Sequence, residues 1–289
     1  MTRLRAMSYN VRYANRYDHH DVWSMRREGL TALVRFHDPD VVGLQEPLPE
    51  QRRDLEAALP GYEFVGRGRR ADGTGEACPI AVRRDRWRIV DSGTFWLSDT
   101  PNEPSTGWDA THPRIATWAH VEPRGNDDGG EREVGGERED ADDGILFLTT
   151  HLDHEGERAR LEGARLIRRR LPRLADGRPV VLVGDFNCTA GSPPHRALIG
   201  GSDGVEAGDP SVEPGSDGGT LVDAAAAASL RHGPRTSVTD FETLIANRRI
   251  DHVLVSPGVE VDAFATLADR DDRGRYPSDH LPVLARLRY

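Results

Sequence analysis

The chain has 289 residues, 30% of them charged, and a net charge of −10, a composition that fits a globular protein and excludes wholesale disorder. Its apolar runs are far shorter than the roughly 20 residues of a membrane-spanning helix, and the N-terminus lacks the apolar core of a secretory signal peptide. We therefore expect a cytoplasmic protein. With only Cys78 and Cys188, neither a disulfide framework nor a four-cysteine zinc site is expected.

Two acidic segments account for the negative charge. Residues 122–143 carry a net −7 and residues 201–219 carry −5, and both lack apolar periodicity. Together they contribute −12 to the total of −10, which leaves +2 for the remainder, where the basic residues are all arginine. We predict a single domain, residues 1–289, with mobile acidic insertions at about 122–143 and 201–219.

The remaining chain alternates short apolar runs with amphipathic stretches. Apolar runs predict strands at 3–11, 41–44, 79–82, 87–97, 145–150, 180–183, 249–255, 259–267 and 282–287. Helical spacing predicts helices at 24–37, 51–59 and 155–174, the last of them rich in arginine on a solvated face. This order indicates one α/β domain.

Polar groups that bind metal or transfer protons stand at the ends of these apolar runs. They are Asn10, Glu46, His151, Asp185 with Asn187, and Asp251, while Asp279 and His280 precede the last run. Ligands of α/β proteins gather beyond strand ends, so these groups could meet at one site. Each one alone has a structural alternative, such as a turn at residues 184–187. Their joint occurrence favours a functional site.

The residue types indicate a particular chemistry. Carboxylate and carboxamide oxygens, without a cysteine cluster, suit a hard cation such as Mg²⁺ or Mn²⁺ better than zinc. His151 and His280 could act in general acid–base catalysis, each oriented by a carboxylate. No phosphate-binding glycine loop followed by Lys-Ser/Thr is present.

The motifs resemble the endonuclease/exonuclease/phosphatase superfamily. They are SYN (8–10), LQE (44–46), HPR (112–114), THLD (150–153), GDFN (184–187), RIDHVLVS (249–256) and SDHLPV (278–283). GDFN and SDHLPV, in this order and spacing, are the most specific. Residues 75–118 further resemble a prokaryotic branch of metal-dependent hydrolases. The resemblance implies a four-layer α/β sandwich, in which two packed, mostly antiparallel sheets are flanked by helices.

The resemblance also implies a role for each motif residue. Glu46 is the expected principal metal ligand, with Asn10 and Asp279 nearby, for one or two Mg²⁺ or Mn²⁺ ions. Asp185 is expected to orient or deprotonate the attacking water, and Asn187 to hold the phosphate. The implied imidazole–carboxylate pairs are His280 with Asp251 and His151 with Glu76, and Arg114 is expected to contact the phosphate. Which group is the base and which the acid stays open.

These observations favour a metal-dependent phosphoesterase and leave its substrate open between a compact phosphoester, slightly favoured, and DNA or RNA. Trp96 and Trp108 could stack on a base or wall a small pocket, although buried core residues are the simpler interpretation. A non-catalytic binding protein on the same fold is the alternative from another class. No obligate protein partner is evident.

Overall fold

The computed structural model describes residues 1–124, 144–200 and 220–289. Most of the two acidic segments therefore lies outside the described residues. The prediction that these segments are mobile concerns residues that the structure does not describe. One boundary was wrong, because Glu122 and Pro123 belong to strand β6 (Ile115–Pro123) and pair with β5 (Trp87–Trp96). The ion pair of Glu122 with Arg88 on β5 contributes to this pairing.

The strands form two mixed sheets. In order, the seven-stranded sheet contains β10 (Leu230–His232), β12 (Glu260–Thr266), β13 (Val283–Arg288), β1 (Arg3–Asn10), β2 (Val41–Gln45), β4 (Ile80–Arg83) and β3 (Tyr62–Val65). The six-stranded sheet contains β5, β6, β7 (Ile145–His151), β8 (Val180–Asp185), β11 (Asp251–Val255) and β9 (Val222–Asp223). Only the pairs β1–β2, β7–β8 and β10–β12 are parallel among the described strands, so both sheets are mostly antiparallel, as predicted.

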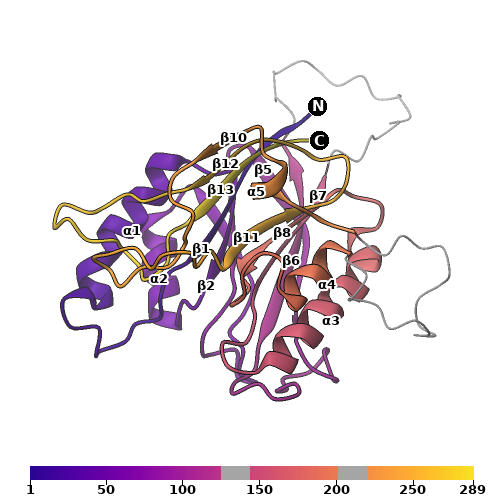
Figure 1. The fold of residues 1–289 in the computed structure, drawn as a ribbon, viewed down its shortest axis with the longest axis horizontal. Coiled ribbons are helices and arrows are strands. Elements are labelled where there is room, and N and C mark those ends of the chain that lie inside the picture. Colours follow the sequence, from indigo (N-terminus) through magenta and orange to yellow (C-terminus); the bar gives the residue numbers. More distant parts are fainter. Residues whose placement is uncertain (125–143, 201–219) are drawn as a thin grey trace.

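Helices cover the outer face of each sheet (Figure 1). Helices α1 (Trp23–His37) and α2 (Pro49–Ala58) pack on the seven-stranded sheet, and α3 (Glu157–Ala175) and α4 (Pro193–Ile199) pack on the six-stranded sheet. A third apolar cluster lies between the two sheets. The predicted four-layer sandwich is therefore confirmed. A 3₁₀ turn (His19–Asp21) and the short α5 (Ala224–Ala227) complete the described elements.

The two sheets are in close contact around Gly43 of β2 and Thr149 of β7. A Cβ atom at Gly43 of β2 would lie 2.4 Å from Cγ2 of Val183 and 2.6 Å from Oγ1 of Thr149, so only glycine fits there. Two residues along, the Gln45 amide donates across the interface to Thr149 Oγ1 at 2.9 Å. This close contact brings the ends of the central strands of both sheets together.

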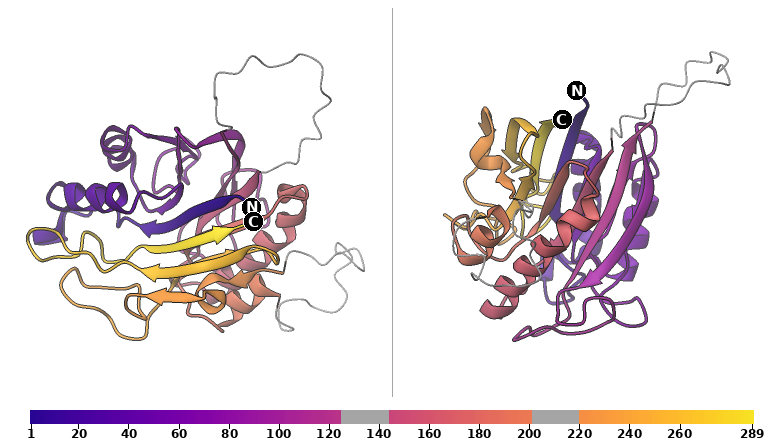
Figure 2. Two further views of the ribbon diagram at one scale, coloured as in Figure 1. Left: turned by 90° about the horizontal axis from the view of Figure 1, so that it is seen from above. Right: turned by 90° about the vertical axis from the view of Figure 1, so that its right-hand side faces the viewer.

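Strand register then places the predicted polar residues at one edge. Parallel pairing puts Asn10 opposite Gln45 and His151 opposite Asp185. Antiparallel pairing puts Asp251, the first residue of β11, opposite Asp185. At the other edge the two chain termini lie side by side (Figure 2) and pair through Thr2 and Tyr289. No helix in the described part of the chain has the length and apolarity needed to span a bilayer.

Arg26 of α1 fixes the backbone beside this edge. The residue is fully buried and donates to the carbonyl oxygens of Asp21, Val11, Arg12 and Pro277. A hydrogen bond of 2.7 Å from the Ser278 hydroxyl to the Asn10 carbonyl joins the same two segments. Arg26 and Ser278 therefore hold together the segment that follows β1 and the segment that precedes β13.

We predict that Arg26→Met lowers the free energy of unfolding by about 3–5 kcal/mol, because several buried carbonyl groups lose their donor. Arg27→Gln is the matched control, since Arg27 is on the same helix with a side chain that is 53% exposed. It should change stability by less than about 0.5 kcal/mol. Urea unfolding of both variants measures the difference, and equally small changes in the two would contradict the assigned role.

Candidate active site

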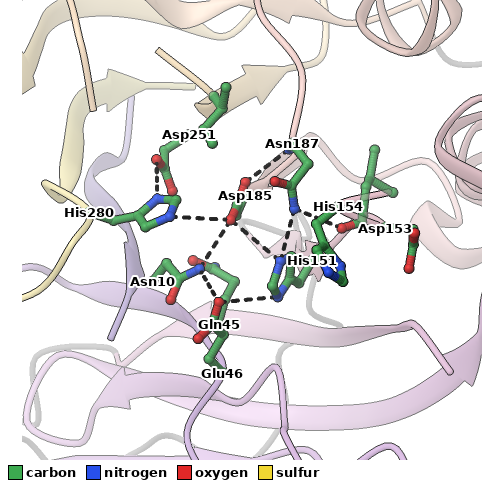
Figure 3. A network of polar contacts seen from close by, with 12 residues as sticks. Asn10, Gln45, Glu46, His151, Asp153, His154, Asp185, Asn187, Asp251 and His280 are labelled. Atoms are coloured by element: carbon green, nitrogen blue, oxygen red, sulfur yellow. Dashed lines mark hydrogen bonds and ion pairs between the residues drawn. The ribbon is translucent and has the colours of Figure 1, made fainter. Parts of the chain in front are cut away.

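The residues at the sheet edge form one connected polar network (Figure 3). The Asn10 amide nitrogen donates to Glu46 Oε1 at 2.9 Å and to Asp185 Oδ2 at 3.0 Å. Glu46 follows β2 of one sheet and Asp185 ends β8 of the other. One amide therefore bridges two carboxylates from different sheets.

Glu46 adopts a left-handed backbone conformation, with φ of +74°. This conformation is unfavourable for a residue with a side chain and recurs at functional sites. The second carboxylate oxygen of Glu46, Oε2, accepts a hydrogen bond from the Tyr13 backbone N–H at 2.9 Å. Asp279 lies on the same side of the site, where Arg12 Nη1 approaches its Oδ2 at 3.5 Å. Burial and the nearby Glu46 carboxylate raise the pKa of Asp279.

These groups fit a hard divalent cation. The donors on this side of the site are oxygen atoms, the carboxylates of Glu46 and Asp279 together with the carboxamide of Asn10, and Mg²⁺ and Mn²⁺ prefer such ligands. A further cluster that could hold an ion consists of Glu46, His151 and Asp185. Burial, and to a smaller extent repulsion by Glu46, raises the pKa of Asp279, and a cation would relieve that repulsion.

Asp185 lies at the centre of the network, almost completely buried. Its Oδ1 accepts from the Asn187 backbone at 2.9 Å, and its Oδ2 lies 3.4 Å from His151 Nε2 and 3.7 Å from His280 Nε2. Burial, opposed by His280 and reinforced by Asp251, raises the pKa of Asp185 to about 7. A carboxylate with this pKa can accept a proton near neutral pH.

His280 and Asp251 form a buried imidazole–carboxylate pair. His280 Nδ1 lies 2.8 Å from Asp251 Oδ2. Burial opposes protonation of the imidazole, but the carboxylates of Asp251 and Asp185 outweigh it and raise the pKa of His280 well above its ordinary value. The sequence-based pairing of these two residues matches the geometry.

His151 has a different environment from the one predicted. Its Nε2 lies 3.0 Å from the Asn187 amide nitrogen, and its Nδ1 is 4.0 Å from Glu46 Oε1. Burial and the nearby Arg114 lower the pKa of His151 well below its ordinary value, which favours the neutral imidazole. The environments of His151 and His280 therefore shift their imidazole pKa values in opposite directions.

The predicted pairing of His151 with Glu76 was wrong. Both oxygens of Glu76 instead accept hydrogen bonds from Arg69, at 2.8 and 2.9 Å. Arg69 is positioned by a small hairpin in which Gly68 pairs with Ala77. The guanidinium presents two parallel donors to one carboxylate, an arrangement that a single imidazole nitrogen cannot match.

Arg114 lies near Arg69 and Glu76, and its side chain is fixed by two partners. Its Nε donates to Asp153 at 3.1 Å, and its Nη2 lies 2.7 Å from His154 Nδ1. Asp153 in turn accepts from the backbone of Glu155 and Gly156. Sequence reasoning missed this supporting role of Asp153, although its position directly after the THL sequence was a usable signal.

A second buried cluster, behind the site, is structural. Asp223 Oδ2 lies 3.1 Å from His195 Nε2 and 2.9 Å from Arg249 Nη2, and His252 Nε2 lies 2.9 Å from the Cys188 carbonyl. These partners already satisfy the groups that could otherwise bind an ion. The cluster ties α4 and β11 to the loop that carries Asn187. The predicted core interpretation of Trp96 also agrees with its burial.

Comparison with known proteins identifies close structural relatives. The sequence matches the model of the Endonuclease/Exonuclease/phosphatase family over residues 7–280. A mannosyl-6-phosphatase of Bacteroides thetaiotaomicron is 32% identical, with a TM-score of 0.83 over 99% of this chain and 100% of that one. A functionally unknown conserved protein from Enterococcus faecalis V583 is 30% identical, with a TM-score of 0.80 over 99% of both chains.

A curated relative matches a shorter part of the chain. An uncharacterized protein of Acanthamoeba polyphaga mimivirus is 33% identical over 94 residues, which are 28% of this chain and 14% of the viral protein. The chain therefore spans only a small part of that protein.

We predict that Asp251→Asn lowers the pKa of His280 in the metal-free protein, because it removes the closest carboxylate that stabilises the imidazolium. Titration of the ring nitrogens by NMR measures this change. His252 serves as an internal reference, since burial lowers its pKa and the substitution leaves its partners in place. An unchanged His280 titration would show that Asp251 does not stabilise the imidazolium.

Proposed function

Because the chain belongs to the endonuclease/exonuclease/phosphatase family, we propose that it is a divalent-metal-dependent hydrolase of a compact phosphoester. The observation that carries the proposal is the position of Asp185 between two imidazoles and beside Glu46. A base that titrates near neutral pH, an imidazolium and an oxygen-rich cation site occur together there. This combination suits attack of water on a phosphoryl group.

We assign Mg²⁺ or Mn²⁺, as one or two ions, to this site. Glu46 is the proposed principal ligand, with Asp279 and the Asn10 carboxamide beside it. A bound ion would neutralise charge on the phosphoryl oxygens and favour the ionised form of the neighbouring carboxylates.

Asp185 is the proposed base for the attacking water. Asn187 and Asn10 hold its two oxygens at 2.9 and 3.0 Å, so the carboxylate is fixed in direction. With a pKa of about 7, it can take a proton from water and still be partly ionised at neutral pH.

His280 is the proposed source of a proton for the leaving oxygen, or of a hydrogen bond to the phosphoryl group. Asp251 holds Nδ1, so Nε2 is the nitrogen available to the reacting groups. Asn187 and Arg114 are the proposed phosphate contacts. The Asn187 side chain is oriented by the Leu152 carbonyl at 3.0 Å, and Arg114 is oriented by Asp153.

A small substrate has more support than a nucleic acid. The relative that aligns over its full length is named for an activity on mannosyl-6-phosphate. Trp96, which could have stacked on a base, is buried and donates to the Arg69 carbonyl at 2.8 Å. A cytoplasmic location, drawn from the sequence, stays a prediction.

We predict metal-dependent turnover of p-nitrophenyl phosphate or bis-p-nitrophenyl phosphate with Mg²⁺ or Mn²⁺, abolished by chelation. Asp185→Asn and His280→Ala should each lower kcat by about 10²–10⁴-fold, because a proton-transfer group is lost. The matched controls are Asp99→Asn and His232→Ala, both at exposed positions. Cleavage of plasmid DNA alone would indicate a nuclease, and absence of all turnover by folded protein would favour a non-catalytic binding protein.

We further predict that Mg²⁺ or Mn²⁺ raises the Tm, since a ligand at 100 times its Kd stabilises the native state by about 2.7 kcal/mol. Glu46→Gln should remove most of this shift, because it deletes the charge of the proposed principal ligand. The control Glu50→Gln changes an exposed carboxylate of α2. Differential scanning calorimetry with and without metal measures the shift, and an unchanged shift in Glu46→Gln would place the ion elsewhere.

A further inference from the structure

A small recess with room for about one water molecule lies beside Glu46 and His151, and Arg69 and Arg114 line it, so a larger anion would sit at its mouth. Its wall also includes Cys78 and Ile115, which are buried and cluster with Trp96. Part of the wall of this recess is thus apolar. Sequence reasoning assigned Arg114 to the phosphate but gave Arg69 no role.

Arg69 is held in place through its backbone and its side chain. Its N–H donates to the Glu76 carbonyl at 3.0 Å, and its own carbonyl accepts from the Trp96 indole at 2.8 Å. The hairpin that carries it is fixed to the segment after Glu46 by a hydrogen bond from Ala77 to the Pro47 carbonyl at 3.1 Å. The bidentate contact with Glu76 then sets the plane of the guanidinium. The group is therefore preorganised relative to the catalytic centre.

Both guanidinium groups keep donors for a ligand. A guanidinium has five N–H groups, and Glu76 accepts from one on each terminal nitrogen of Arg69. Within residues 1–124, 144–200 and 220–289, the other N–H groups of Arg69 have no hydrogen-bond partner. Arg114 uses Nε and Nη2 for Asp153 and His154, which leaves Nη1. Two fixed guanidinium groups with unshared N–H groups, side by side at the mouth of this recess, suit an anion with several acceptor oxygens.

Phosphomonoesters and phosphodiesters differ in the number of such oxygens. A terminal phosphate has three non-bridging oxygens and a charge of about −1.5 to −2 at neutral pH. A diester has two non-bridging oxygens and a single charge, and its second ester arm needs a way out of the site. The several unshared N–H groups of Arg69 and Arg114 match the larger number of oxygens and the higher charge of a terminal phosphate.

We propose that Arg69, positioned by Glu76 and acting with Arg114, binds a terminal phosphate and makes this protein selective for phosphomonoesters. The inference rests on the proposed function and narrows its substrate class. Arg69 is a substrate-binding residue in this proposal, and Glu76 is a positioning residue that acts through it.

The first test compares p-nitrophenyl phosphate with bis-p-nitrophenyl phosphate. Wild type should have the higher kcat/KM for the monoester. Arg69→Gln should lower kcat/KM for the monoester by about 10- to 100-fold, the loss expected when a charged hydrogen bond is removed, and should change the diester value by less than about threefold. Arg70→Gln, an exposed arginine of the same hairpin, should change neither. Equal losses on both substrates, or an unchanged monoester value in Arg69→Gln, would overturn the proposal.

Glu76→Gln distinguishes two possible roles of Glu76, which are positioning Arg69 and acting through His151. The substitution leaves both arginines in place. If Glu76 positions Arg69, the variant should lose monoester activity selectively and keep the wild-type pH profile. If it acted through His151, both substrates would suffer equally and the pH profile would change, which would overturn the proposal. This variant decides the matter even if Arg69→Gln fails to fold.

Binding of inorganic phosphate to the metal-loaded protein, measured by calorimetry, gives a readout independent of turnover. Arg69→Gln should weaken it by about 10-fold or more relative to Arg70→Gln, and equal affinities would overturn the proposal. Wild type that hydrolyses only the diester would refute monoester selectivity and leave the proposed function intact. Wild type that hydrolyses neither ester would refute the proposed function itself.

Discussion

The arrangement of this site depends on keeping two carboxylates from different sheets close together in a buried place. The Asn10 amide meets this constraint by donating to Glu46 and Asp185 at once. A carboxylate in its place would add a third negative charge, and an apolar side chain would leave both acids without this donor. The close approach at Gly43 and the hydrogen bond from Gln45 to Thr149 keep the sheets near enough for the bridge.

Much of the fold and the centre of the site follows from local patterns. Strands β2, β7 and β8 contain short apolar runs and β1 alternates polar with apolar residues, and each of the four ends at or directly before a polar group. Because β1–β2 and β7–β8 are parallel pairs, these ends fall on the same edge. The positions of the polar groups at strand ends therefore predicted that they meet, whereas the four-layer fold and the residue pairs were implied by the family resemblance.

The predictions differ from the structure where a strand or a side-chain pair depends on a distant segment or on an irregular loop. Strand β6 was not predicted, because its Thr117, Trp118 and His120 interrupt the apolar pattern next to an acidic segment, although pairing with β5 and β7 stabilises it. The family resemblance implied that Glu76 pairs with His151, and no local pattern shows that the hairpin turns Arg69 toward Glu76. Side-chain partners within a loop depend on its turn geometry, which apolar periodicity does not encode.

The buried acids give the centre a further property, an exchange of protons for a cation. Burial raises the pKa of Asp185 and of Asp279, so without metal these groups hold protons at a pH where exposed carboxylates have lost them. A Mg²⁺ or Mn²⁺ ion bound as proposed would have to displace those protons, and its apparent affinity would therefore increase with pH. The pH of the surroundings would then set the fraction of molecules that carry metal, so the burial that raises the pKa of the proposed base would also control loading of the proposed ion.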